Sequence, residues 1–278
     1  MVTANALIRF LCSWLLFASQ LSQGAIFGDG NQANGPEDNR TSAPKYLLGG
    51  VGTVFCDGAL RGTATQIQTG AMSFKRAPSI IVTAAHVLFN ADSGKPFTDC
   101  RYQPKNKRLM AVPFGEISTH SYQPVDGNKL RQSVTDIVFV ALQHRLYDTG
   151  FTLSSSASSE ELLLLGYNES TENIDLSHSC RQYQSQIFNS TELLLHDCDS
   201  TAGASGGPVF AVAHGDNRDR KNYQVIAVHG GTLASIDQAV PGAKADAEQW
   251  INQARKIDLI TLDRLKTFLA YLQKDSVN

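Results

Sequence analysis

Short apolar segments separated by turn residues run through most of this 278-residue chain. Each segment is rich in leucine, β-branched or aromatic residues and only a few positions long, which favours strands over helices. The segments expected to form strands are 46–56, 62–68, 79–89, 108–115, 136–142, 161–168, 180–188, 191–198, 207–213 and 223–231. Many short strands of this kind predict an all-β domain.

The last apolar pattern has a different period. Leucine and phenylalanine recur every three or four residues near the end of the chain, which is the spacing of an amphipathic helix. The positions concerned are Leu259, Leu262, Leu265, Phe268, Leu269 and Leu272. We therefore expect residues 246–278 to form a helical segment that closes the β domain.

Polar and small residues divide the rest of the chain into parts. Residues 25–45 are rich in Gly, Asn and Pro, which is typical of an irregular arm or a propeptide. A serine cluster at 154–161 predicts a linker between a first half, 46–153, and a second half, 162–245.

The first 24 residues have the pattern of a secretory signal peptide. A single arginine, Arg9, precedes an apolar run from Phe10 to Ala18, and small and polar residues follow it. The apolar run is too short for a stable membrane anchor, so we expect cleavage after Gly24 and no membrane association afterwards. The expected location is therefore secreted or periplasmic.

Composition and cysteine usage narrow the classes of function. The net charge is −2, so no basic surplus suggests a nucleic-acid partner. Cys12 lies in the signal segment, and the four other cysteines of an exported chain predict two disulfides. Three pairings are possible, and the sequential one, Cys56–Cys100 with Cys180–Cys198, keeps each bridge inside one half. No Cys-x-x-Cys occurs, so we expect neither a metal nor another cofactor.

Three separate stretches carry the residue types needed for acyl transfer by serine. "GASGG" places Ser205 among small residues, "IVTAAHVL" ends an apolar strand at His86, and "VTDIVFVAL" puts Asp136 before a fully apolar run. A serine nucleophile needs a base to take its proton and a carboxylate to orient that base. A lone histidine or turn serine is usually structural, but the three together predict a catalytic site in a cleft between the two halves.

In this order, His, Asp and then Ser, the motifs resemble those of the chymotrypsin-like serine proteases over roughly residues 45–250. The resemblance implies two six-stranded antiparallel β-barrels with the active-site cleft between them, followed by the C-terminal helix. It also implies a serine endopeptidase acting on proteins or peptides, and we expect it to be a monomer. Ser205 would attack the substrate, His86 would act as base and Asp136 would orient it, while the amides of Gly203 and Ser205 would form the oxyanion hole.

A closer resemblance is to the small secreted branch that includes glutamyl endopeptidases, through "IFG" near residue 26 and the pattern "CDSTAGASGGP". Animal trypsins carry an aspartate where this chain has Ala204, and that aspartate pairs with the new amino terminus after zymogen cleavage. Because alanine cannot form an ion pair, we expect maturation without that switch.

Substrate preference is left open by the sequence. His229 lies where glutamyl endopeptidases have a histidine that meets an acidic side chain, and Asp199 lies six residues before the serine, where trypsins select Lys or Arg. An acidic, a basic and a broad preference are all possible on this basis. Gly230 and Gly231 would let a substrate strand pair with the enzyme backbone.

An alternative from a different class is a catalytically silent, protease-like module that binds peptides. Such modules usually lack a triad member, whereas this chain has all three. Labelling by a serine-reactive fluorophosphonate probe distinguishes the two hypotheses.

Overall fold

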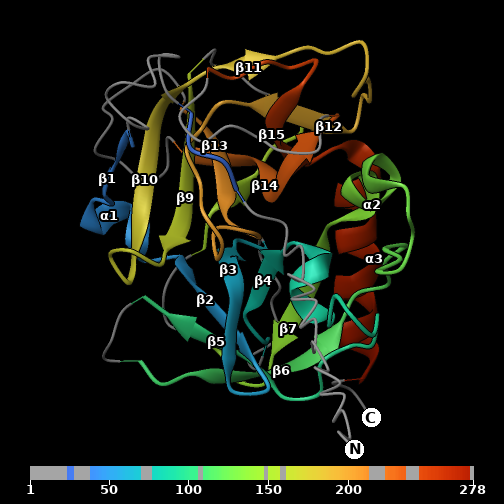
Figure 1. Cartoon of the computed structure of the whole chain (residues 1–278). Helices are drawn as coiled ribbons and strands as arrows, with labels where there is room; N and C mark the ends of the chain where they lie inside the picture. Colours follow the sequence, from blue (N-terminus) through green and yellow to red (C-terminus); the bar gives the residue numbers. More distant parts are fainter. Residues whose placement is uncertain are drawn as a thin grey trace, which may run out of the picture.

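Two β-barrels stacked one above the other make up the body of the molecule (Figure 1). The structure is a computed structural model that describes residues 24–27, 38–69, 77–105, 109–146, 150–156, 161–212, 223–235 and 244–275. The signal segment expected at 1–24 lies outside the described residues except for Gly24, as do parts of the arm and of the serine linker. In the described part of the chain, no helix is long and apolar enough to cross a membrane.

The first barrel is closed by six antiparallel strands in the order β2-β3-β4-β7-β6-β5. These strands are β2 (Val51–Cys56), β3 (Ala59–Ile67), β4 (Ile80–Thr83), β5 (Cys100–Pro104), β6 (Val112–Ile117) and β7 (Val138–Leu142). The fully apolar β7 is buried along its whole length, because one face lines the barrel and the other packs on the rest of the protein.

The other strands form a nine-stranded sheet that follows the order β1-β10-β9-β13-β14-β15-β12-β11, with β8 paired to β14 in parallel. Its strands are β1 (Arg40–Ser42), β8 (Thr152–Leu153), β9 (Leu162–Asn168), β10 (Asn173–Cys180), β11 (Gln182–Tyr183), β12 (Leu193–His196), β13 (Pro208–Val212), β14 (Tyr223–Ala234) and β15 (Trp250–Lys256).

This sheet also closes on itself. Only Arg181 separates β10 from β11. The first of these segments pairs with β9 and the second with β12, so the two act as one bent strand. If β10 and β11 are counted as one strand, the second barrel has six strands. In addition, β1 pairs with β10 and β8 pairs with β14. The fold class expected from the sequence, two barrels and a C-terminal helix, is confirmed.

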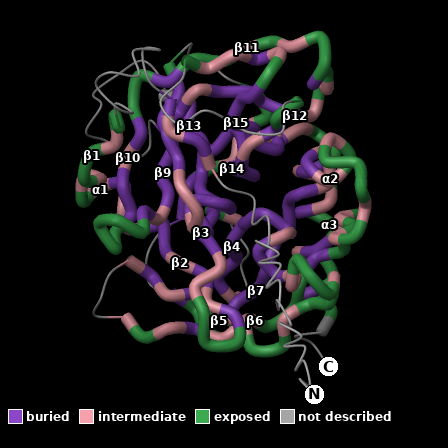
Figure 2. The backbone as a smooth tube through the Cα atoms, viewed as in Figure 1, coloured by how far each residue is buried: buried purple, intermediate pink, exposed green. Residues whose placement is uncertain are grey.

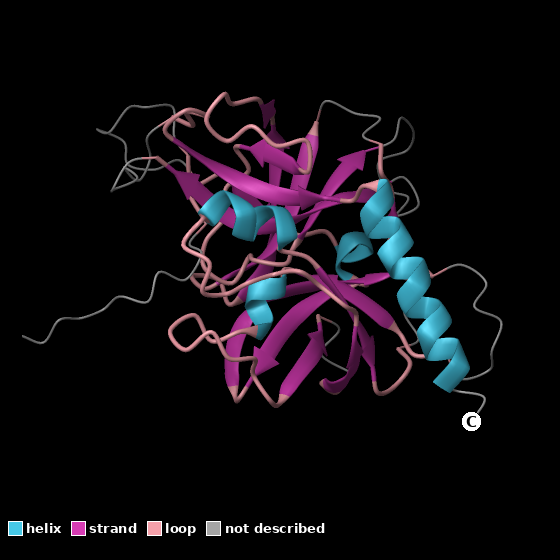
Figure 3. Cartoon of the chain, turned by 90° about the vertical axis from the view of Figure 1, so that its right-hand side faces the viewer, coloured by secondary structure: helices cyan, strands magenta, loops and turns pink. Residues whose placement is uncertain are grey.

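The described residues include four helical elements beside the barrels: α1 (Lys45–Leu48), the 3₁₀ turn η1 (Ala85–Leu88), α2 (Lys129–Thr135) and α3 (Leu259–Asp275). Helix α3 runs along the side of both barrels (Figure 3). Leu265, Phe268 and Leu272 are buried in the core that it shares with the first barrel, whereas Leu259 is 75% exposed. The predicted apolar face is therefore correct except at its first position.

The boundary expected for the C-terminal helical segment, 246–278, is wrong. Residues 250–256 form β15, a central strand of the second barrel, and the helix begins only at Leu259. The strand was missed because Asn252, Gln253 and Arg255 are polar, yet all three are buried at 6% exposure or less. Strands β5 and β10 and helix α2 were missed too, since their sequences are also largely polar.

Figure 2 shows that buried residues run through the strands of both barrels. In the described part of the chain they form one large core and two smaller ones. In β9, Leu162 and Leu164 point into the second barrel, and Leu163 and Leu165 pack into the large core that includes the first barrel. This alternation explains the unbroken leucine run, because each face of the strand meets apolar neighbours.

Each barrel contains one disulfide. Cys56 is bonded to Cys100 and Cys180 to Cys198, which is the sequential pairing. The first joins neighbouring strands β2 and β5, and the second ties the bend of the β10–β11 strand to the segment that leads to Ser205. A bridge near that segment restricts the unfolded chain and limits motion of the loop that holds the serine.

Candidate active site

His86 and Asp136 meet in the first barrel. His86 lies in the 3₁₀ turn after β4, and Asp136 caps the end of α2 just before β7. The Asp136 carboxylate accepts two hydrogen bonds, from the His86 backbone N–H at 2.8 Å and from His86 Nδ1 at 2.6 Å. Because an ionised carboxylate can only accept, Nδ1 carries the proton and Nε2 is left with a lone pair. The Asp136 side chain is 5% exposed and that of His86 is 19% exposed.

Ser205 sits in a tight turn of the second barrel, in front of β13. The turn needs glycine at two positions, since φ is +93° at Gly203 and +86° at Gly206. A Cβ at Gly206 would also lie 2.1 Å from the Thr63 carbonyl oxygen of the other barrel. The absence of side chains therefore lets the serine turn press against the first barrel.

Thr63 of β3 holds the turn of Ser205 by hydrogen bonds across the interface between the two barrels. Its backbone N–H donates to the carbonyl of Ser205 at 2.7 Å, and its hydroxyl donates to the carbonyl of Gly203 at 2.7 Å. The same hydroxyl accepts the N–H of Tyr167 at 2.9 Å. This role could not be predicted from the sequence, because a threonine in a strand has no local signal that identifies its distant partners.

The amides of the serine turn are divided into two groups. The N–H groups of Ala204, Gly206 and Gly207 are bonded to carbonyls of Thr201, His229 and Ala204, respectively. Those of Gly203 and Ser205 donate to no other group in the described part of the protein. Two neighbouring amides left in this way can bind the developing negative charge on a substrate carbonyl.

The turn of Ser205 lies next to the turn of His86, but no hydrogen bond joins these two residues. A Cβ built on Gly62 would lie 2.5 Å from the Ser205 carbonyl and 2.8 Å from Val87 Cγ2, so both turns meet at this glycine. In unliganded enzymes such catalytic hydrogen bonds are often long and shorten when substrate binds.

Two arginines near the C-terminus, in β15 and α3, bind the segment that contains Asp136. Arg255 of β15 donates through Nε to the Val134 carbonyl, and Arg264 of α3 donates through Nη2 to the Ile137 carbonyl at 3.0 Å. Because these carbonyls flank Asp136, charged donors hold the backbone on both sides of this residue.

Gly230 and Gly231 lie on β14, and Gly230 is beside Asp136. A Cβ at Gly230 would be 3.1 Å from Asp136 Oδ2. On one side, residues 231–234 of β14 pair with β15. On the other side, β14 pairs with β13, and this pairing ends at Val228. A peptide added as a further strand along β14 beyond Val228 would run next to Asp136.

His229 is fully buried and touches a second buried histidine. The Cys198 N–H donates to His196 Nδ1, which places the proton of that ring on Nε2, and this nitrogen lies 3.3 Å from His229 Nδ1. The proton of His229 is then on Nε2, which has no hydrogen-bond partner among the described residues. Burial lowers the pKa of both imidazoles, that of His196 to about 3, so the pair is neutral at physiological pH.

Asp199 is engaged by the N-terminal arm. Its Oδ1 accepts the Phe27 N–H and its Oδ2 accepts the Asn39 N–H, both at 2.8 Å, and the residue is 3% exposed. Phe27 in turn packs on Trp250 with ring centroids 4.8 Å apart. Burial raises the pKa of Asp199 to about 6, because the two amide donors offset only part of the desolvation of the carboxylate.

This raised pKa predicts a pH dependence of stability. The folded protein binds a proton at Asp199 below about pH 6 and the unfolded chain only below about pH 4, so the stability contributed is lost as the pH rises between these values. We expect the free energy of unfolding of wild type, relative to Asp199→Asn, to fall by about 2 kcal/mol from pH 4 to pH 7. Urea unfolding at each pH measures it, and a constant difference would contradict the argument.

Asp57 provides a control of opposite sign. It is exposed, and the backbone N–H of Asp99 lowers the pKa of its carboxyl. Its contribution to stability is therefore present at higher pH and is lost as the pH falls through the folded pKa. The Asp57→Asn comparison should change in the direction opposite to that of Asp199→Asn.

Ala204 is 2% exposed and packs directly on β9, where a Cβ at Gly166 would lie 2.5 Å from the Ala204 Cβ. The arm reaches the neighbouring loop by other contacts. Arg40 donates to the Thr201 hydroxyl at 2.8 Å, and the Ser200 N–H donates to the Ala25 carbonyl at 2.9 Å. The loop before Ser205 is thus ordered without an ion pair at position 204.

Solved structures of serine proteases resemble this molecule. A Glu endopeptidase aligns with a TM-score of 0.59 and 16% identity over 84% of this chain and 98% of its own. Kallikrein-related peptidase 10 aligns with a TM-score of 0.54 and 10% identity over 82% of this chain and 99% of its own. Neuropsin, from mouse brain, has a TM-score of 0.54 and 13% identity over 82% and 98% of the two chains. At these identities the likeness shows the fold alone.

The two barrels with a serine, a histidine and an aspartate at their interface therefore define the chymotrypsin-like serine protease fold. The model of the trypsin-like peptidase domain family matches residues 67–216, more than half of the chain, and the chain belongs to this family. No similar sequence was found among curated proteins.

Proposed function

We propose that the chain is a secreted serine endopeptidase that uses Ser205, His86 and Asp136 as its catalytic triad. The observation that carries the proposal is the pair of hydrogen bonds from His86 to the buried Asp136 carboxylate. They leave His86 Nε2 able to accept a proton, and the turn of Ser205 lies on the same barrel interface. Family membership supports the same reaction class.

The proposed reaction has two steps. Ser205 Oγ attacks the scissile carbonyl while His86 Nε2 takes its proton, and the amides of Gly203 and Ser205 bind the resulting oxyanion. His86 then gives the proton to the leaving amine, which frees the carboxyl-side peptide and leaves an acyl-enzyme. Water, deprotonated by His86, hydrolyses the ester, and Asp136 stabilises the imidazolium in both steps.

For the side chain before the cleaved bond, the contacts argue against selection of Lys or Arg. Both oxygens of Asp199 already accept backbone amides of the arm, so this carboxylate is a poor partner for a substrate cation. His229 Nε2–H has no partner among the described residues and could donate to an acidic or amide side chain once a substrate opens a path to the buried ring. We therefore propose an acidic preference, and digestion of a peptide library tests it: absence of cleavage after Glu or Asp would contradict the role of His229.

A fluorophosphonate probe tests the triad itself. We expect labelling of the wild type and none of Ser205→Ala, since the probe reacts only with a serine activated by a neighbouring base. The matched control is Ser155→Ala, because Ser155 is an exposed serine outside the interface and its loss should leave labelling unchanged.

Failure of labelling would favour the other class of function. A wild-type protein that is well folded by circular dichroism but unlabelled would support the non-catalytic peptide-binding module. Labelling that persists in Ser205→Ala would instead place the nucleophile elsewhere.

A further inference from the structure

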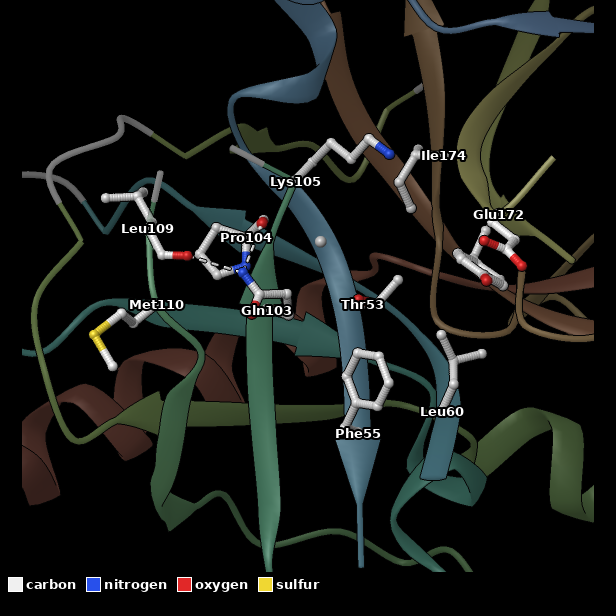
Figure 4. A pocket seen from close by; sticks show the side chains of 12 residues that line it. Thr53, Phe55, Leu60, Gln103, Pro104, Lys105, Leu109, Met110, Glu172 and Ile174 are labelled. Atoms are coloured by element: carbon white, nitrogen blue, oxygen red, sulfur yellow. Dashed lines mark hydrogen bonds between the residues drawn. The ribbon is translucent and has the colours of Figure 1, made fainter. Parts of the chain in front are cut away.

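A hollow of about 550 Å³ opens beside the serine turn, between β2 and β5 of the first barrel and the β9–β10 hairpin of the second. Figure 4 shows Thr53, Phe55 and Leu60 along the first barrel, with Glu172 and Ile174 across from them. Its volume lies within the range of pockets that bind side chains and small ligands.

Apolar side chains make up much of its wall; those of Phe55 and Leu60 are only half-buried, whereas Ile174 is buried. In β2, Val54 and Cys56 point inwards, so Thr53 and Phe55 face outwards and are only half-buried. Phe55 pairs with Leu60 across the hairpin, and Ile174 pairs with Tyr167 on the opposite wall. A half-exposed aromatic facing other apolar groups gains free energy when an apolar ligand covers it.

The hollow adjoins Gly203, whose amide is proposed to bind the oxyanion. A Cβ built on Gly203 would lie 2.8 Å from Tyr167 Cδ1 and 3.3 Å from Leu60 Cδ2, so two wall residues contact this glycine. Gly230, where we place the amino-side half of the substrate in this proposal, lies instead beside Asp136. The hollow is therefore on the opposite flank of Ser205, where the leaving half of the substrate must pass.

The charges at the rim do not favour one sign. Lys105 hydrogen-bonds the Asn173 side chain, which links β5 to β10, and Glu172 stands at the edge of the same hairpin. With one cation and one anion at the rim, the apolar walls dominate recognition.

We propose that this hollow is a specificity pocket for a large apolar side chain within the first three residues on the carboxyl side of the cleaved bond. The inference rests on the proposed peptidase function. An extended peptide advances about 3.3 Å per residue, so residues close to the scissile bond can reach a pocket that touches Gly203.

The test compares substrates that share one acyl part. Peptides carry leucine or glycine at each of the first three carboxyl-side positions, and a methyl ester has no residue there. We expect kcat/KM of wild type to be at least about tenfold higher for leucine than for glycine at one of these positions. Phe55→Ala should reduce that ratio to near one and leave hydrolysis of the methyl ester unchanged, because its leaving group does not reach the pocket.

Two further variants make the result independent of folding defects. Thr53→Trp fills the hollow from the same strand and should also abolish the leucine preference. Ile117→Ala is the control: it changes a partly exposed apolar residue that does not line the hollow, and it should preserve the preference. Equal rates for leucine and glycine in wild type, or a preference unchanged in both pocket variants, would overturn the pocket. A wild type that neither hydrolyses the ester nor is labelled by the fluorophosphonate would overturn the peptidase function itself.

Discussion

We expect Asp136→Asn to lose about four orders of magnitude in kcat while it folds normally. The His86 backbone N–H donates to Oδ1 of Asp136, and this bond decides how an asparagine amide would be oriented. Its oxygen would keep the backbone donor, so its NH₂ group would face His86 Nδ1. The imidazole must then accept at Nδ1 and carry its proton on Nε2, where it can no longer take the proton of Ser205.

Steady-state kinetics on a peptide and thermal unfolding of the same samples check this result. Asp126→Asn is the matched control, because Asp126 forms an ion pair with the exposed Arg131 at 3.3 Å, away from His86. It should retain wild-type kcat. Near-normal activity of Asp136→Asn would show that the carboxylate does not set the tautomer of His86.

The largest expected loss of stability comes from Asn252→Leu. This residue of β15 is fully buried, and its amide accepts the Ala25 N–H and donates to the carbonyls of Ala25 and Cys198. It also bonds the hydroxyls of Ser200 and Thr232. Leucine has a similar volume but leaves these buried groups unpaired, so we expect a cost of about 3 to 5 kcal/mol.

Urea unfolding measures this cost, with Asn128→Ala as the comparison. The Asn128 side chain accepts the Arg131 N–H at the exposed start of α2, and loss of such a cap costs about 1 kcal/mol. Equal losses in the two variants would contradict the structural role of Asn252.

The same contacts bear on maturation. Because Ala25 and Phe27 supply partners for Asn252 and Asp199, we expect the start of the arm to remain in the mature protein. N-terminal sequencing of the secreted form would identify Ala25 as the first residue if cleavage follows Gly24. A terminus beyond Phe27 would contradict this expectation and agree with a removable propeptide.

The sequence by itself indicated the features that depend on neighbouring residues. The apolar runs identify β7, β9 and β14 because each has a buried face that any strand in a barrel requires. The residue types at His86, Asp136 and Ser205 suggest a triad since each occurs in a short motif at the end or beginning of a strand. The period of α3 follows in the same way from side chains on one face of a helix.

Tertiary structure alone decided where polar residues find partners. Asn252 and Ala25 are 227 positions apart, and Asp199 and Phe27 are 172 apart, so no local pattern distinguishes these buried groups from a surface loop. For this reason β15 had no strand signal, and Asp199, a candidate for selecting basic substrates, is held by the arm. The hydrogen bonds of Thr63 to the serine turn and the hollow beside Gly203 also depend on tertiary structure. Both form only where the two barrels pack against each other.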